Sequence, residues 1–321
     1  MIGKTISHYR IIEKIGGGGM GIVYKAQDIN LDRLVALKFL PPTFYQDDEA
    51  KQRFILEAKA ASSLQHQNIC TIHEIDETED LPAVAGGQLF ICMDCYDGET
   101  LKSKIANGSL DSIETIKIIL QIAEGLNKAH EKGIIHRDIK PANIFITNEG
   151  IVKILDFGLA RSLGKDQLTE IESTTGTCNY MSPEQVLGEE VDQRTDIWAL
   201  GIIMFEMLTG KLPFDSNYNQ SIIYSILNKE LELEKLKTQV PESIGQIIFK
   251  CLKKDTDERY QLIEELMFEL KEVKRDSLIT FSGIQPKFPP FLDDGSEEII
   301  SDKSIQIEQL ETEFKVTLPL L

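Results

Sequence analysis

His136-Arg137-Asp138-Ile139-Lys140-Pro141-Ala142-Asn143 follows a segment with helical periodicity near the middle of the chain, and Asp156-Phe157-Gly158 comes shortly after it. Two further motifs precede this stretch: a glycine-rich run at residues 16–21, and Val35-Ala36-Leu37-Lys38. The order and spacing of the four motifs are far more specific than any one of them alone, and together they decide the fold.

The glycine-rich run has the spacing GxGxxG, which alone is weak evidence, because glycines also mark ordinary turns and dinucleotide-binding folds use the same spacing. In a dinucleotide-binding fold the glycines open a helix, whereas here they lie between two strand-like runs. We therefore expect a β-hairpin flap whose backbone N–H groups approach phosphate oxygens, because no Cβ atoms block the approach.

Lys38 ends a strand-forming run, where a lysine is costly unless its ammonium meets an anion. Glu57, in the helix expected to follow, can supply one carboxylate, and bound phosphates can supply further negative charge. Taken alone, Lys38 is better explained as an edge-strand lysine that extends its ammonium into solvent.

The arrangement of these four motifs resembles the eukaryotic-type serine/threonine protein kinase family, and the wording GGMGIVYKA and YMSPEQ is most similar to bacterial members. The resemblance covers residues 9–275. It implies an α+β, two-lobed fold with a small, mainly antiparallel β N-lobe containing one helix (about 9–95) and a larger, mainly α-helical C-lobe (about 98–275). Residues 1–8 are then an N-terminal extension, and residues 276–321 an acidic tail or linker.

The periodicity of the chain fits two such lobes. Strand-like runs lie at residues 9–15, 21–28, 33–40, 68–75 and 88–94, with one helix expected at 48–64. Beyond residue 98 the pattern changes to helices, expected at residues 112–132, 195–209, 219–229, 241–252 and 261–274.

The resemblance implies a non-specific serine/threonine protein kinase that transfers the γ-phosphate of ATP to hydroxyl groups of protein substrates. Asp138 then accepts or orients the proton of the substrate hydroxyl, and Lys140 lies near the γ-phosphate. Asn143 and Asp156 are implied ligands of Mg²⁺, which prefers hard oxygen donors. Lys38 and Glu57 complete the implied catalytic set.

The adenine of ATP needs an apolar slot with two backbone hydrogen bonds. By the resemblance, Ile15, Val23 and Ala36 form its roof and Phe145 its floor, although simple core packing explains each of these residues equally well. Met93 is the implied gatekeeper, with the Asp94 carbonyl and the Tyr96 amide as hinge contacts. The implied phosphate-binding residues are Gly16, Gly17, Gly18, Gly19, Met20 and Gly21.

Arg137 directly precedes Asp138, which in the resembled family indicates control by phosphorylation of the loop after residue 158. A phosphate placed against Arg137 and Arg161 would order that loop through charge-assisted hydrogen bonds. Thr177 is set apart, since the matching family position contacts the catalytic residues. The candidate acceptors, each of which is otherwise a solvated hydroxyl, are Thr169, Ser173, Thr174 and Thr175.

Residues 176–185 (GTCNYMSPEQ) resemble the segment of protein kinases that docks the protein substrate. The resemblance implies two structural roles here. Glu184 is expected to form a buried ion pair with Arg259, and Asp196 is expected to accept hydrogen bonds from the backbone of the catalytic loop.

The 321 residues carry 52 acidic and 34 basic side chains, and the resulting net charge of -18 argues against nucleic acid or an anionic membrane as a partner. Nine acidic residues and three lysines in 276–321 contribute -6 of this charge. The longest apolar run, Ile197 to Leu208, is too short to span a bilayer and contains Glu206. Five scattered cysteines indicate a reducing compartment, so a cytoplasmic enzyme is expected.

Two other readings compete with an active protein kinase. A pseudokinase-like nucleotide-binding scaffold predicts the loss of Lys38, Asp138 or Asp156, and all three are present. A small-molecule kinase of the same fold is disfavoured by the segment 176–185. Protein substrates, including a second copy of the chain phosphorylated in trans, are the expected partners.

Overall fold

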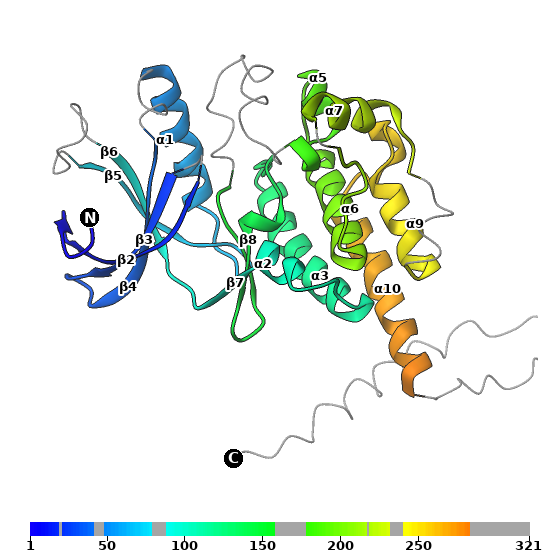
Figure 1. The fold of residues 1–321 in the computed structure, drawn as a ribbon, viewed down its shortest axis with the longest axis horizontal. Helices are drawn as coiled ribbons and strands as arrows, with labels where there is room; N and C mark the ends of the chain where they lie inside the picture. The colour runs from blue at the N-terminus through cyan, green and yellow to red at the C-terminus, as the bar shows by residue number, and fades with distance from the viewer. Residues whose placement is uncertain are drawn as a thin grey trace, which may run out of the picture. The chain divides into compact units, whose positions relative to one another are not determined.

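The computed structural model describes residues 1–18, 21–41, 48–78, 88–157, 178–216, 218–231 and 240–282. The chain divides into two units, Met1–Phe281 and Ser282–Leu321, and the fold below is that of the first. This unit contains a β-rich lobe followed along the chain by a helical lobe, as predicted (Figure 1).

The β-rich lobe is built on a six-stranded antiparallel sheet in the order β1-β2-β3-β4-β6-β5. Its strands are β1 (Thr5–Ile6), β2 (Tyr9–Gly18), β3 (Gly21–Asp28), β4 (Arg33–Phe39), β5 (Ile72–Thr78) and β6 (Gln88–Asp94). Helix α1 (Asp48–Ser62) follows β4 and precedes β5 along the chain.

Alternation along the strands sends side chains to two separate cores. Leu37 and Cys92 pack in one core, and their neighbours Ala36 and Met93 pack in the other, which α1 supplies with Phe54 and Ala58 among others. Both faces of β4 and β6 are therefore buried, which explains why these two strands are almost uniformly apolar.

A second, three-stranded sheet joins the lobes: β7 (Gly98–Thr100), β8 (Ile144–Thr147) and β9 (Val152–Ile154), in that order. These strands are too short to stand out in the sequence. The segment from Asp94 to Gly98 is the single connection from β6 into this sheet, and is called the hinge below.

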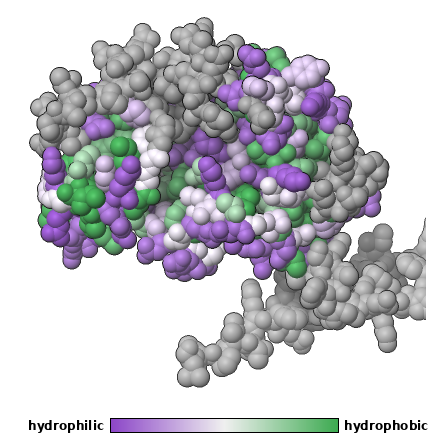
Figure 2. Space-filling view, in the orientation of Figure 1, coloured by the Kyte–Doolittle hydropathy of each residue, from purple (hydrophilic) through white to green (hydrophobic). Residues whose placement is uncertain are grey.

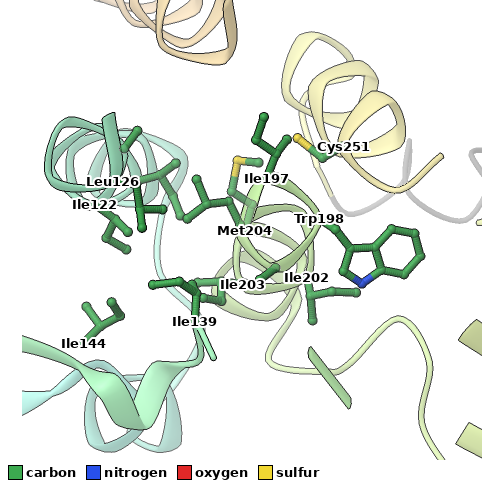
Figure 3. Close-up of a cluster of buried hydrophobic side chains, with 14 of the residues drawn as sticks. Ile122, Leu126, Ile139, Ile144, Ile197, Trp198, Ile202, Ile203, Met204 and Cys251 are labelled. Carbon is green, nitrogen blue, oxygen red and sulfur yellow. The ribbon is translucent and has the colours of Figure 1, made fainter. Parts of the chain in front are cut away.

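The helical lobe surrounds α6, which is apolar around most of its circumference and is consequently largely buried. Figure 3 shows α6 side chains directed both toward α3, where Leu126 lies, and toward α9, where Cys251 lies. The helices of this lobe are α2 (Leu101–Ala106), α3 (Ser112–His130), α5 (Pro183–Leu187), α6 (Arg194–Thr209), α7 (Asn219–Asn228), α9 (Glu242–Cys251) and α10 (Ile263–Ser282). Short 3-10 turns lie at η2 (Pro141–Asn143), η3 (Cys178–Tyr180) and η4 (Thr256–Glu258).

The outer surface is mixed in character. On the face shown in Figure 2, charged and polar residues alternate with small hydrophobic patches. Within the described residues, no helix is both long enough and apolar enough to cross a bilayer. α10 continues to Ser282, past residue 276, where the tail is expected to begin.

Candidate active site

Asp138, Lys140 and Asn143 converge in the loop between α3 and β8. The Lys140 ammonium donates to the Asp138 carboxylate at 2.8–2.9 Å. The Asn143 amide nitrogen donates both to the Asp138 carbonyl and to its Oδ2, each at 2.9 Å. The carboxylate is thus held from two sides, with a fixed orientation and a cation beside it.

Asp196 of α6 holds the backbone of this loop. Its buried carboxylate accepts from the amides of His136 and Arg137, both at 2.9 Å, and lies 2.8 Å from His130 Nε2. Arg137 has a φ of 67°, a costly conformation for a residue with a Cβ, which these hydrogen bonds stabilise. Burial disfavours the charged carboxylate, but the contacts with His130 and His136 outweigh it, so the pKa of Asp196 lies below its usual value.

His136 has a structural position. It is fully buried, its Nε2 lies 2.9 Å from the Leu155 carbonyl, and its ring packs on Phe157 at 4.7 Å. The Leu155 amide also donates to the Asn143 carbonyl at 2.8 Å. The catalytic loop and the segment leading to Asp156 are therefore joined side by side.

Lys38 is 5% exposed, and its ammonium lies 2.8 Å from Asp156 Oδ2. Asp156, at a φ of 59°, lies two residues after the end of β9. Glu57 is half-buried on α1. The ion pair that the structure gives for Lys38, within the described residues, is the one with Asp156. The pairing of Lys38 with Glu57 therefore stays a prediction.

The residues expected around adenine lie on strands of both sheets. Ala36 of β4 is the cross-strand partner of Met93, and Val23 of β3 is the partner of Lys38. Phe145 of β8 is half-buried, while Ile15 is 49% exposed at the start of the glycine-rich hairpin. Behind Met93, a cavity lined by Cys70, Ile91 and Phe157 among others extends to Asp156.

The glycine-rich run forms the hairpin between β2 and β3, as predicted, with Gly16, Gly17 and Gly18 paired to residues of β3. Gly19 and Met20 lie outside the described residues. At Gly21, φ is +117° and a Cβ would lie 2.1 Å from the Phe39 carbonyl oxygen. Only glycine fits there, and its role is to let the hairpin lie closely against β4.

Replacing Gly21 by alanine is expected to lower the free energy of unfolding by about 1–3 kcal/mol and to weaken ATP binding, because the strained φ and the clash displace the hairpin. The matched control is Gly108→Ala, which also places an alanine at a positive φ (+140°) but whose Cβ would meet no atom within 4 Å. Urea denaturation and nucleotide titration of both variants test this. Equal behaviour of the two variants would contradict it.

A second pocket is lined by Asp138 together with Ile139, Tyr180 and Met181 among others. Here the Gln185 amide donates to the Arg137 carbonyl at 2.8 Å, and Tyr180 donates to Glu206 at 2.7 Å. The segment expected to dock substrate therefore lies against the catalytic loop. Glu184, at the start of α5, forms a two-pronged ion pair with Arg259 at 2.8 and 2.9 Å.

Two of these contacts were not anticipated from the sequence. Glu206 is a single acid within a long apolar run, and this was the one signal that it faces something polar. His130 carried no signal, since the last turn of a helix commonly holds a basic residue. Arg161 and the candidate phosphate acceptors Thr169, Ser173, Thr174 and Thr175 lie outside the described residues.

The oxygen donors expected to hold Mg²⁺ are of a suitable kind. The Asn143 amide nitrogen is engaged by Asp138, which leaves its oxygen as an available acceptor, and Asp156 offers a carboxylate. A neutral and an anionic oxygen ligand, completed by phosphate oxygens, fit the hard and partly hydrated Mg²⁺ ion.

Comparisons with known proteins identify relatives of this chain. The family model for the protein kinase domain matches residues 9–269. The chain is 42% identical over 274 residues to serine/threonine-protein kinase PrkC of Bacillus subtilis, which covers 84% of this chain and 41% of that protein. It is 33% identical over 290 residues to serine/threonine-protein kinase PknB of Mycobacterium tuberculosis, covering 89% and 45%. The chain thus spans less than half the length of these relatives.

The solved structure of the PknI kinase domain of Mycobacterium tuberculosis has the same fold. It matches with a TM-score of 0.68 at 26% identity, covering 85% of this chain and 98% of that one.

Proposed function

Because this chain belongs to the protein kinase family, we propose that it is an active serine/threonine protein kinase, which transfers the γ-phosphate of ATP to Ser or Thr hydroxyl groups of proteins. The observation that carries the proposal is the convergence of Lys140 and Asn143 on the Asp138 carboxylate. A nucleotide-binding scaffold would not need this arrangement, and the scaffold alternative is not supported.

Asp138 acts on the substrate hydroxyl. Its carboxylate, fixed by Asn143, accepts the hydroxyl hydrogen bond and directs the oxygen toward the γ-phosphorus. Ile139, Tyr180 and Met181 line a small pocket beside Asp138, which places the segment expected to dock the substrate next to this carboxylate. Catalysis here is mainly positioning, since phosphoryl transfer needs little covalent chemistry from the protein.

The charge of the phosphates is balanced by two lysines. Lys140, at the Asp138 carboxylate, faces the transferring phosphoryl group, and Lys38 contacts the phosphates closer to the ribose. Mg²⁺, held by Asn143 and Asp156, neutralises phosphate charge when it is bound. Lys38 and Asp156 already form an ion pair, so both groups are oriented before ATP arrives.

The direct test is incubation with Mg²⁺ and γ-labelled ATP, alone and with a generic basic protein, beside an Asp138→Asn control. Label on Ser or Thr of either protein, absent with the control, supports the proposal. Failure to label either protein despite measured ATP binding would favour a nucleotide-binding scaffold.

We also propose activation by phosphorylation in trans within residues 169–175. The support is Arg137, which directly precedes Asp138 and whose backbone is fixed by Asp196 and Gln185. Mass spectrometry of active protein should find phosphate on Thr169, Ser173, Thr174 or Thr175, and replacing all four by alanine should lower activity at least about tenfold. An unmodified loop, together with full activity of the fourfold variant, would refute this.

A cytoplasmic setting for this domain is part of the proposal. All five cysteines are free thiols, as expected in a reducing compartment where ATP is available. Protein substrates are the proposed partners, and the net charge of -18 disfavours nucleic acid.

A further inference from the structure

The hinge carries the two backbone groups that bind adenine under the proposed function, the Asp94 carbonyl and the Tyr96 amide. β6 ends at Asp94 and β7 begins at Gly98, so residues 95 and 96 lie outside strand pairing, while the Asp97 carbonyl accepts from the Asn148 amide at 3.0 Å. The side chains of the same two residues instead contact each other: the Tyr96 hydroxyl donates to Asp94 Oδ2 at 3.0 Å.

Asp94 is held from its other side by the neighbouring strand. His73 of β5 places Nε2 at 2.8 Å from Asp94 Oδ1, and the Asp94 amide donates to the Thr71 carbonyl at 3.1 Å. Burial disfavours the charged carboxylate, but the hydrogen bonds from His73 and Tyr96 outweigh it and hold the pKa of Asp94 below its usual value. Asp94 is therefore an ionised acceptor at neutral pH, which strengthens both hydrogen bonds.

Tyr96 is oriented by the second sheet. Its ring lies 6.3 Å from that of Phe145, the expected floor of the adenine slot, and the Lys153 ammonium lies 4.9 Å from its centroid. Phe145 and Lys153 are cross-strand partners in β8 and β9. Burial raises the pKa of the Tyr96 phenol, which keeps the hydroxyl protonated as a donor.

We propose that the Tyr96 hydroxyl and the Asp94 carboxylate, supported by His73, form a hinge lock that holds the adenine-binding backbone in its binding shape. This inference rests on the proposed function. The lock spans residues i and i+2, so it fixes Cys95 between them. It also connects β5 of one sheet to β8 and β9 of the other through side chains.

The consequence is preorganisation. Without the lock, the hinge must be ordered when the nucleotide binds, and the ordering cost weakens binding. Because adenine contacts the hinge equally in the ground state and the transition state, the loss raises KM for ATP and leaves kcat nearly unchanged. Tyr96 is thus a positioning residue.

The test variant is Tyr96→Phe, which keeps the ring against Phe145 and removes only the hydroxyl. We expect KM for ATP and Kd for ADP to rise about fivefold, with kcat changed less than about twofold. The rise is smaller than the full worth of a hydrogen bond to a charged group because the free protein loses the bond as well as the complex. The matched control is Tyr260→Phe in the helical lobe. Tyr260 also donates to a carboxylate, Glu269, at 2.5 Å, and also has a lysine, Lys250, over its ring at 3.9 Å.

A double-mutant cycle with Asp94→Ala decides whether the two side chains act together. If they do, Tyr96→Phe in the Asp94→Ala background raises Kd for ADP less than about twofold. Full additivity of the two changes, or equal Kd values for Tyr96→Phe and Tyr260→Phe, would overturn the hinge lock. Calorimetric binding of ADP needs no phosphoryl transfer, so the outcome stands even if the wild-type protein proves inactive and the proposed function fails.

Discussion

Asp138→Asn is expected to lower kcat by about 10³-fold, within the range typical for loss of a group that accepts a proton in the transition state. Asparagine keeps the size of the side chain, and its carbonyl oxygen can still accept from Lys140 or Asn143. What is lost is the negative charge that orients and accepts the substrate hydroxyl proton. Steady-state kinetics with labelled ATP and a basic protein substrate measure the loss.

Measuring ADP binding separates a loss of catalysis in Asp138→Asn from a loss of folded structure. Because Asp138 faces the substrate hydroxyl and not the adenine slot, Kd for ADP should change less than about threefold in Asp138→Asn. Asp257→Asn serves as the matched control, since Asp257 forms an exposed ion pair with Arg194 far along the chain and should leave kcat unchanged. A loss of less than tenfold in kcat for Asp138→Asn would show that Asp138 is not the acceptor.

Most elements of the fold were predictable because their periodicity is strong. β3 and β6 begin and end where the apolar runs do, and α3, α6, α7 and α9 lie within two residues of their predicted bounds. β1 and β7–β9 are only two to four residues long, too short to show a period of two. The N-terminal part of the 68–75 run is not strand; β5 instead continues to Thr78.

The candidate site was predictable where function fixes residue types at short spacings. Asp138, Lys140 and Asn143 are such a set, and they do lie together. Contacts between segments far apart in the sequence were harder to predict, because periodicity does not indicate which side chains meet in the folded protein. The ion pair of Lys38 with Asp156 and the inward Tyr96 ring both depend on how the two sheets meet.

Arg259→Met is expected to lower the free energy of unfolding by about 3–5 kcal/mol, because it leaves Glu184 as a buried carboxylate without its cation. Arg259 is 2% exposed, and besides the two bonds to Glu184 its guanidinium donates to the carbonyls of Lys253 at 2.8 Å and Lys254 at 3.2 Å. A lysine cannot reproduce this planar fork, so Arg259→Lys should also be destabilising. The control is Arg194→Met, whose partners Asp192 and Asp257 are 50% and 84% exposed, so that the loss of these ion pairs should cost less than about 1 kcal/mol.

The pH dependence of the stability difference between wild type and Arg259→Met tests whether the ion pair with Glu184 causes it. Burial alone would raise the pKa of Glu184, but the hydrogen bonds and charge of Arg259 outweigh it and hold the pKa below the ordinary value of 4.5. The ion pair therefore stabilises the fold fully above pH 4.5, and this contribution is lost as the pH falls further and Glu184 becomes protonated. Urea denaturation at pH 7 and at successively lower pH should show the gap in unfolding free energy between wild type and Arg259→Met narrowing. The narrowing begins above pH 4.5, because burial without Arg259 raises the pKa of Glu184 in the variant and the carboxyl is protonated there first, and it continues until Glu184 is protonated in the wild type as well. A gap that stays constant would assign the destabilisation to lost packing against Trp198, whose ring lies 5.0 Å from the guanidinium, and not to the ion pair.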